Sequence, residues 1–171
     1  MVKILFLNWN QLNFHIMKYF VFIICILFGG KSLSQVSLPQ ETGKIIVDQY
    51  IKGYQTGDTL RMKSMAHPNI TLQTMFLNED QENALLYISP SGLYKYIAAN
   101  ATQEKFEFRL TDYVVHSDGN LGHVWAPYFF YKNGKFAYCG SFSFSLTYTD
   151  DSWKILNVAE SRRIGSCFDH D

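Results

Sequence analysis

The sequence predicts an α+β fold in which helices cover one face of a curled, mostly antiparallel sheet. Three observations support this expectation. Segments with helical spacing of apolar residues lie between residues 41 and 100, and alternating apolar and polar residues follow from residue 106 onward. An Asp-Gly and an Asn-Gly pair separate the alternating segments, as tight turns do between antiparallel strands. The length of 171 residues suits one domain.

The chain begins with a predicted export signal. Lys18 precedes an unbroken apolar run over residues 19–28, and a Ser-Leu-Ser cleavage site ends at Ser34, before Gln35. This is the pattern of a secretory signal peptide. The run is shorter than the roughly 20 residues that a membrane-spanning helix needs. We therefore expect an exported protein, periplasmic or secreted, with an uncleaved anchor as the alternative.

The predicted domain organisation follows from this signal. Residues 1–34 are an N-terminal extension and signal peptide, with Met1 and Met17 both open as the start, and residues 35–171 are a single domain. This domain has twelve basic and fifteen acidic residues, hence a net charge of −3. Such a charge excludes a nucleic-acid binder, and nothing in it attracts an anionic membrane after cleavage.

Three helices are predicted, each with its own boundary signal. The first covers residues 41–56 and ends at Gly57, a residue that favours the left-handed conformation at helix ends. Asp58 is a typical N-cap for a short second helix over residues 59–65. The third covers residues 91–100 and has a proline in its first turn.

The first predicted strands form a hairpin, residues 70–77 with residues 84–88, around a polar turn. The next strand is expected to place alternate residues on one face: Phe106, Phe108, Leu110, Asp112 and Val114.

Three more strands complete the predicted sheet. Residues 121–131 are apolar on both faces and suit a central strand, but Pro127 demands a bulge or an edge position. After the Asn-Gly turn, residues 136–148 alternate cleanly, and residues 153–160 are the last strand. The following residues share one face of the alternating strand: Phe136, Tyr138, Gly140, Phe142, Phe144, Leu146 and Tyr148.

Two cysteines follow the signal segment, Cys139 and Cys167. An even pair in an exported protein predicts one disulfide, which would contribute roughly 3 kcal/mol by the chain-entropy model. The alternative is two separate buried thiols. Neither cysteine lies in a CxxC pair or beside a histidine, and the histidines lack ligand spacing. We expect no metal site and no cofactor.

Three segments carry a resemblance to a known family: YIKGYQTGD (residues 50–58), VWAPYFFYKNGKFAYCGSFSFSL (residues 124–146) and DSWKILNVAESRR (residues 151–163), followed by Cys167. In this order they resemble the nuclear transport factor 2-like superfamily, specifically its SnoaL-like and lumazine-binding-like exported bacterial members. The resemblance covers nearly all of residues 41–167.

The resemblance implies a cone-shaped, cystatin-like roll around an apolar cavity, and a homodimer. Some members are cofactor-independent enzymes, such as polyketide cyclases, ketosteroid isomerase and scytalone dehydratase, while many have no demonstrated activity, so the fold does not decide the function. The sequence departs from its relatives at two places. Tyr138 replaces a histidine before the Cys-Gly pair, and Glu160-Ser161 replaces Asp-Thr before the twin arginines.

Our leading hypothesis is an exported small-molecule-binding domain, without catalysis, that holds a small apolar or aromatic molecule in the cone. The expected pocket residues are mostly aromatic: Tyr54, Trp125, Tyr128, Tyr138, Phe142, Glu160 and Arg162. For Glu160 and Arg162 the alternative is a surface ion pair.

The second hypothesis is an isomerase, cyclase or dehydratase with Tyr138 as the acid and Asp112 or His67 as the base. Asp112 would qualify if its strand face lined the cavity, because burial raises the pKa of a carboxyl. Its alternative is a solvated residue beyond the strand end, and that of His67 is a junction histidine bonded to the backbone. The third hypothesis is a dimeric interaction module with a filled cone.

Overall fold

The computed structural model describes residues 36–165 and Cys167, and these belong to one compact unit. The predicted signal peptide and the choice between Met1 and Met17 lie outside the described residues. Within the described part of the chain, no helix is long and apolar enough to cross a membrane.

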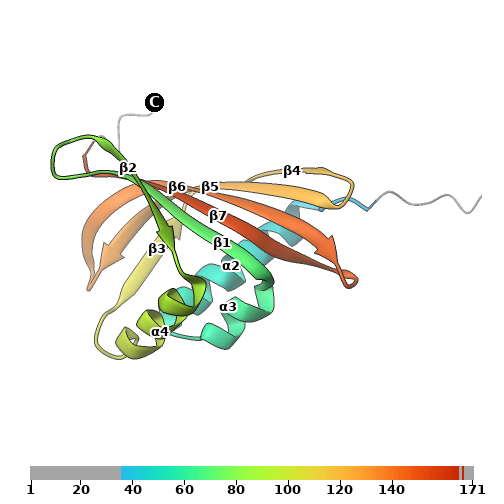
Figure 1. Cartoon of the computed structure of the whole chain (residues 1–171), viewed down its shortest axis with the longest axis horizontal. Helices are drawn as coiled ribbons and strands as arrows, with labels where there is room; N and C mark the ends of the chain where they lie inside the picture. The colour runs from blue at the N-terminus through green and yellow to red at the C-terminus, as the bar shows by residue number, and fades with distance from the viewer. Residues whose placement is uncertain (1–35, 166, 168–171) are drawn as a thin grey trace, which may run out of the picture. The chain divides into compact units, whose positions relative to one another are not determined.

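The helices lie on one side of the sheet (Figure 1). They are α2 (Gln40–Thr56), α3 (Thr59–Met65) and α4 (Pro90–Asn100), close to the predicted ranges. Gly57 has a φ of 75° and ends α2 in the left-handed conformation. Asp58 caps α3 by accepting a hydrogen bond of 2.9 Å from the Arg61 backbone N–H. Both predicted helix boundaries are therefore confirmed.

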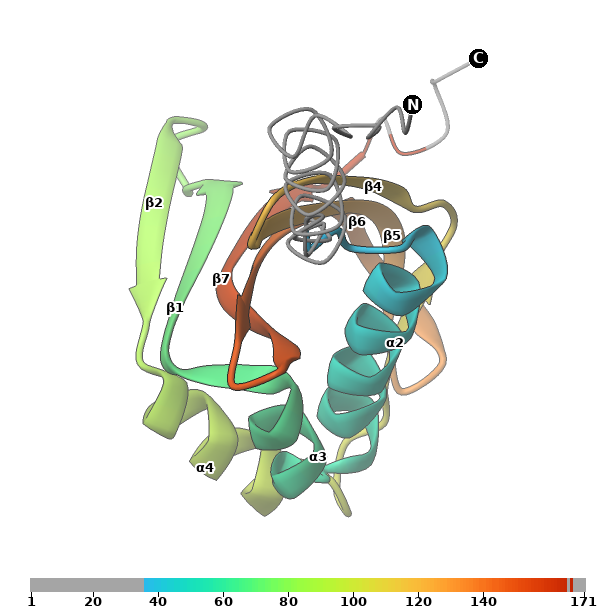
Figure 2. The ribbon, with the colours of Figure 1, turned by 90° about the vertical axis from the view of Figure 1, so that its right-hand side faces the viewer.

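A seven-stranded sheet forms the other layer, in the order β2-β1-β7-β6-β5-β3, with β4 also paired to β5. All neighbours are antiparallel except β1 and β7, which run parallel. The sheet arches over α2 (Figure 2). The strands are β1 (Ala66–Leu77), β2 (Asn83–Ile88), β3 (Phe106–Leu110), β4 (Val114–Asp118), β5 (Leu121–Lys132), β6 (Lys135–Thr149) and β7 (Ser152–Arg163).

The inner, helix-covered face of the sheet carries the core. The alternation predicted for β6 is confirmed over most of its length, since Phe142, Phe144 and Leu146 are buried while the serines between them are half-buried. α2 packs Val47, Tyr50 and other buried residues against this face, and the Tyr50 ring meets Phe144 edge to face. Aromatic residues thus fill much of the interior.

One predicted strand is two strands. β3 ends at Leu110 and β4 begins at Val114, so Asp112 lies in the connection and does not share the face of Phe108. The cause is Pro127 on β5, which has no N–H for the ladder. The Thr111 N–H still donates to the Pro127 carbonyl at 3.0 Å, but the pairing stops there. The proline is therefore accommodated by a break in the neighbouring strand, not by a bulge or an edge position.

A bulge interrupts the β5–β6 pairing next to Phe130 and Tyr131, where Ala137 of β6 is the extra residue. Because Tyr131 pairs with Phe136 while Phe130 pairs with Tyr138, the alternation of β6 shifts at this point. Phe136 is 42% exposed and contacts the rings of Phe129 and Tyr131. The prediction that Phe136 shares the inner face with Tyr138 is wrong.

The disulfide between Cys139 and Cys167 is confirmed, with Cα atoms 5.8 Å apart. It joins β6 to the segment that follows β7. A disulfide of this kind is typical of proteins in an oxidising compartment.

Candidate functional site

Polar side chains from three strands meet at Glu160 on the inner face of the sheet. The Tyr128 hydroxyl donates to Glu160 Oε1 at 2.6 Å, and the Thr74 hydroxyl donates to Oε2 at 3.0 Å. Arg162 Nη2 donates to Oε2 at 2.7 Å. The Glu160 residue is only 6% exposed. Both carboxylate oxygens are therefore engaged by donors inside the protein.

Strand register places these groups together. Alternation along β7 turns Val158, Glu160 and Arg162 inward, where they line a common cavity. Thr74 on β1 lies directly opposite Glu160 in the parallel pairing. The ion pair between Glu160 and Arg162 is therefore a partly buried feature, and the surface-pair alternative does not apply.

Gly140 allows the β6 backbone to lie close to the Ser161 carbonyl and the Tyr128 hydroxyl, behind the Glu160 cluster. A Cβ atom at this position would lie 1.8 Å from the Ser161 carbonyl oxygen and 3.0 Å from the Tyr128 hydroxyl. That hydroxyl also approaches the Ser161 carbonyl at 3.2 Å. Only glycine fits here without a shift of the backbone.

Arg162 has one donor that the fold does not satisfy. Its guanidinium carbon lies 5.0 Å from the centre of the Tyr138 ring, a cation–π contact. Its Nη2 serves Glu160, but its Nε is buried and has no hydrogen-bond partner among the described residues. Burial alone would lower the pKa of Arg162, yet the hydrogen bond and charge of Glu160 raise that pKa above its ordinary value.

The tyrosines around the cluster keep their protons. Burial, followed by the Glu160 charge, raises the pKa of Tyr54 to about 12. The same two causes raise the pKa of Tyr128 and Tyr138 well above the usual range. At neutral pH these residues are hydrogen-bond donors and poor proton-transfer groups.

A cavity of about 60 Å³ adjoins the cluster. It is small because aromatic rings pack closely in the interior, with the ring centroids of Tyr128 and Phe142 4.4 Å apart and those of Phe130 and Tyr138 4.7 Å apart. Its lining combines apolar, aromatic and polar residues from α2, α4 and the sheet: Tyr50, Ile51, Tyr54, Leu72, Gln73, Thr74, Ile88, Leu93, Phe108, Phe142, Val158, Glu160 and Arg162.

Most of the predicted pocket residues lie together. Tyr54, Phe142, Glu160 and Arg162 line this cavity, and Tyr128 and Tyr138 contact the charged pair beside it.

Trp125 does not join them. It is 41% exposed on the outer face of β5, because the alternation that buries Val124, Ala126 and Tyr128 turns it outward. The prediction that Trp125 lines the pocket is therefore wrong.

The candidate bases do not meet Tyr138. Asp112 is exposed and its carboxylate accepts a hydrogen bond of 2.7 Å from the Tyr113 N–H. His67 lies on β1, and its Nδ1 accepts from the Asn69 N–H at 3.1 Å. Both residues therefore match the non-catalytic alternatives given for them. Asp112 is a solvated residue beyond the strand end, and His67 is bonded to the backbone.

Thr74 is the member of the cluster that sequence reasoning missed. Nothing in the chain signals that β1 pairs in parallel with a strand 86 residues away.

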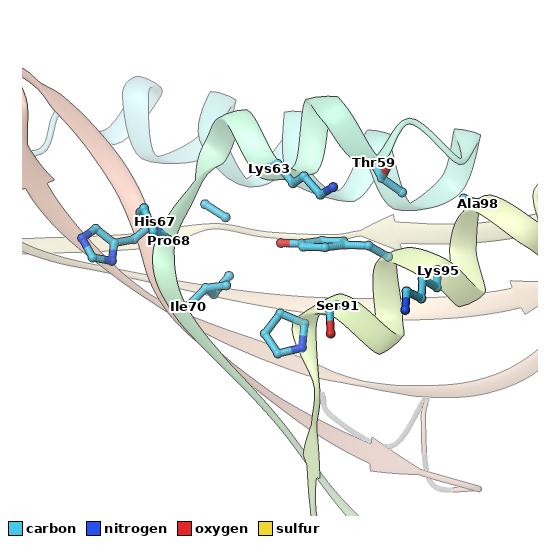
Figure 3. Close-up of a pocket in the computed structure, with 11 residues that line it drawn as sticks. Thr59, Lys63, His67, Pro68, Ile70, Ser91, Lys95 and Ala98 are labelled. Carbon is cyan, nitrogen blue, oxygen red and sulfur yellow. The ribbon is translucent and has the colours of Figure 1, made fainter.

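A second, larger hollow is lined by residues of α3, the start of β1 and α4 (Figure 3). This groove has a volume of about 650 Å³ and lies between these elements. Its lining residues are Thr59, Lys63, Ala66, His67, Pro68, Ile70, Pro90, Ser91, Tyr94, Lys95 and Ala98. Within residues 36–165 and Cys167, no group of three or more His, Cys, Asp or Glu side chains is placed to hold a metal ion.

No protein-family model matches the sequence, and a comparison with curated proteins finds no match either. Solved structures do match. A protein of unknown function with a cystatin-like fold from Nostoc punctiforme gives a TM-score of 0.58 at 6% identity, over 76% of this chain and 97% of that one. An NTF2-like protein from Cytophaga hutchinsonii gives 0.57 at 8% identity, over 72% and 97%.

The beta subunit of benzoate 1,2-dioxygenase from Burkholderia mallei gives a TM-score of 0.57 at 11% identity, over 75% of this chain and 93% of that chain. Identities this low carry information about the fold alone. Together with the curved sheet over α2, they confirm what the sequence resemblance implied: the chain has an NTF2-like fold.

Proposed function

We propose that this protein is a small-molecule-binding domain whose site is the cavity between Tyr54, Phe142 and the Glu160–Arg162 pair. The observation that carries the proposal is the buried Arg162 Nε without a partner. A buried donor left unsatisfied costs about 1–3 kcal/mol, and more for a charged group. A ligand oxygen at this position would recover that cost.

The surroundings of Arg162 define the ligand class. The acceptor must be a carbonyl or carboxylate-like oxygen, because the free group is a cationic N–H. The rest of the molecule would contact Tyr54, Phe108 and Phe142, which favour a flat apolar or aromatic body. No cofactor is part of this proposal.

The site favours binding over acid–base catalysis. Glu160 is the carboxylate in the cavity lining, and its hydrogen bonds from Thr74, Tyr128 and Arg162 give it a structural role. The tyrosines hold their protons too strongly to act as acids near neutral pH. Asp112 and His67 lie elsewhere. The isomerase-type hypothesis therefore lacks its base.

A ligand enters only if one wall of the cavity moves. The volume of about 60 Å³ equals that of about two water molecules, far below the roughly 300 Å³ of a typical ligand pocket. Ile88 and Leu93 are half-buried and flank the β2–α4 junction, so outward movement of this wall would enlarge the cavity. Binding would then restrain α4.

Native mass spectrometry of the purified protein tests the proposal. We expect excess mass that disappears on denaturation, and its loss in the variant Arg162→Lys, which removes the Nε donor but keeps the charge. Tyr138→Phe is the matched control, because it preserves the ring under the guanidinium. A clean polypeptide mass, with no thermal stabilisation by aromatic ketones or carboxylates, would refute a ligand site here.

We propose further that the protein is exported and works as a homodimer. The Cys139–Cys167 disulfide supports an oxidising compartment. Trp125 and Phe136, 41% and 42% exposed on the outer face of the sheet, favour contact with a second copy. The intact mass of the secreted protein, expected to begin at Gln35, tests export. Sedimentation of Trp125→Glu against wild type tests the dimer.

A further inference from the structure

The groove between α3, β1 and α4 has the features of a second binding site, separate from the cavity at Glu160. Its volume of about 650 Å³ lies within the range of roughly 300–1,000 Å³ that ligand pockets occupy. The buried side chains of Ala66 and Ile70 line it, and Pro68, Pro90 and Ala98 add further apolar surface. A ligand lying here would remove a continuous apolar surface from water.

The charged residues of this groove are all of one sign. Lys63 enters from α3 and Lys95 from α4, on opposite sides of the opening (Figure 3). No aspartate or glutamate is among the lining residues. Within the part of the chain that the structure describes, neither lysine forms an ion pair. Two unpaired ammonium groups across an apolar floor favour an anion.

Tyr94 adds an aromatic surface to the groove lining. The Lys63 Nζ lies 5.3 Å from the centre of its ring, so the ring already holds one cation near the groove. The Tyr94 residue is half-buried and lines the groove. A flat or extended apolar group can pack on it while its head group reaches an ammonium.

From this arrangement we propose that the groove binds a small amphipathic carboxylate, with its apolar body on Ile70 and Tyr94 and its carboxylate between Lys63 and Lys95. An inorganic anion would leave the apolar floor in contact with water. A neutral apolar molecule would leave both lysines without an anionic partner. Only a ligand with both parts uses the whole surface. The site goes beyond the proposed function, since it shares no lining residue with the inner cavity.

The experiment compares two probes of the same shape, 4-phenylbutanoate and its neutral amide, by isothermal titration with the purified protein. Charge-assisted hydrogen bonds favour the carboxylate, so we expect it to bind at least about tenfold more tightly than the amide. Charge reversal in the double variant Lys63→Glu/Lys95→Glu should remove this preference. The matched control, Lys52→Glu/Lys135→Glu, changes two exposed lysines outside the groove and should stay within about twofold of wild type.

A second variant and a second readout locate the binding. Ala98→Trp fills the groove from an exposed position of α4 and should abolish binding of both probes. Amide shifts on titration should concentrate at Lys63, Tyr94 and Lys95. Equal affinity for the two probes, no binding of either at millimolar concentration, or shifts centred on Arg162 would each overturn the proposal.

Discussion

Replacing Glu160 by alanine tests whether the Glu160 cluster is a buried hydrogen-bonded network. The change removes the acceptor for three donors at once, from Thr74, Tyr128 and Arg162. Breaking a buried ion pair by deleting one partner costs about 3–5 kcal/mol. Two features reduce this figure. The Arg162 side chain is 36% exposed and stays partly hydrated, and the Tyr128 hydroxyl keeps the Ser161 carbonyl at 3.2 Å.

We therefore expect Glu160→Ala to lower the free energy of unfolding by about 3 kcal/mol, the lower end of that range. For a domain of this size the loss corresponds to a fall in Tm of about 10 °C. Urea unfolding and thermal unfolding, both followed by circular dichroism, measure the two quantities.

The exposed pair of Glu107 and Arg109 provides the matched control, with side chains 32% and 58% exposed. Glu107→Ala should cost far less stability than Glu160→Ala, because water screens the exposed pair. If the two variants lose the same stability within error, the cluster at Glu160 is no more than a surface ion pair, and the proposed ligand site loses its structural basis.

Three further predictions rest on single features. Gly140→Ala should unfold the protein or lower its Tm by more than Glu160→Ala does, because the new Cβ would lie 1.8 Å from a backbone oxygen; a wild-type Tm would contradict the geometry. Tyr54 has a pKa raised to about 12, so its contribution to stability is complete below its ordinary pKa of 10.0 and is lost as the pH rises toward 12. Unfolding titrations between pH 9 and 12 should therefore be less steep in Tyr54→Phe. Cys139→Ser/Cys167→Ser should cost roughly 3 kcal/mol in urea unfolding, and an unchanged midpoint would argue against the bond.

Local signals were sufficient for most of the fold. The Asp58 cap, the Gly57 stop and the alternation of residues 138–148 each act within a few residues, so the chain itself reveals them. The alternation of residues along β5 also predicts the correct position of Trp125. Counting by twos from Tyr128 turns Trp125 outward, and expecting a bulge at Pro127 obscured this.

What sequence reasoning missed depends on which strands are neighbours. Pro127 interrupts the strand beside it and not its own, so the position of Asp112 follows only from the pairing of β3 and β5. Thr74 joins the cluster through a parallel register with β7. Neither relation leaves a periodic pattern in the chain, because pairing partners are selected by tertiary packing.

The parallel pairing of β1 with β7 also determines when the site can assemble. Thr74 and Glu160 are 86 residues apart, and β7 is the last strand to leave the ribosome. Until it arrives, β1 and β6 have no common neighbour and the Glu160 cluster does not exist. Contacts of such long range slow folding. A nascent chain that lacks β7 would therefore stay incompletely folded, and the proposed export through a channel that accepts only extended polypeptide requires such a state.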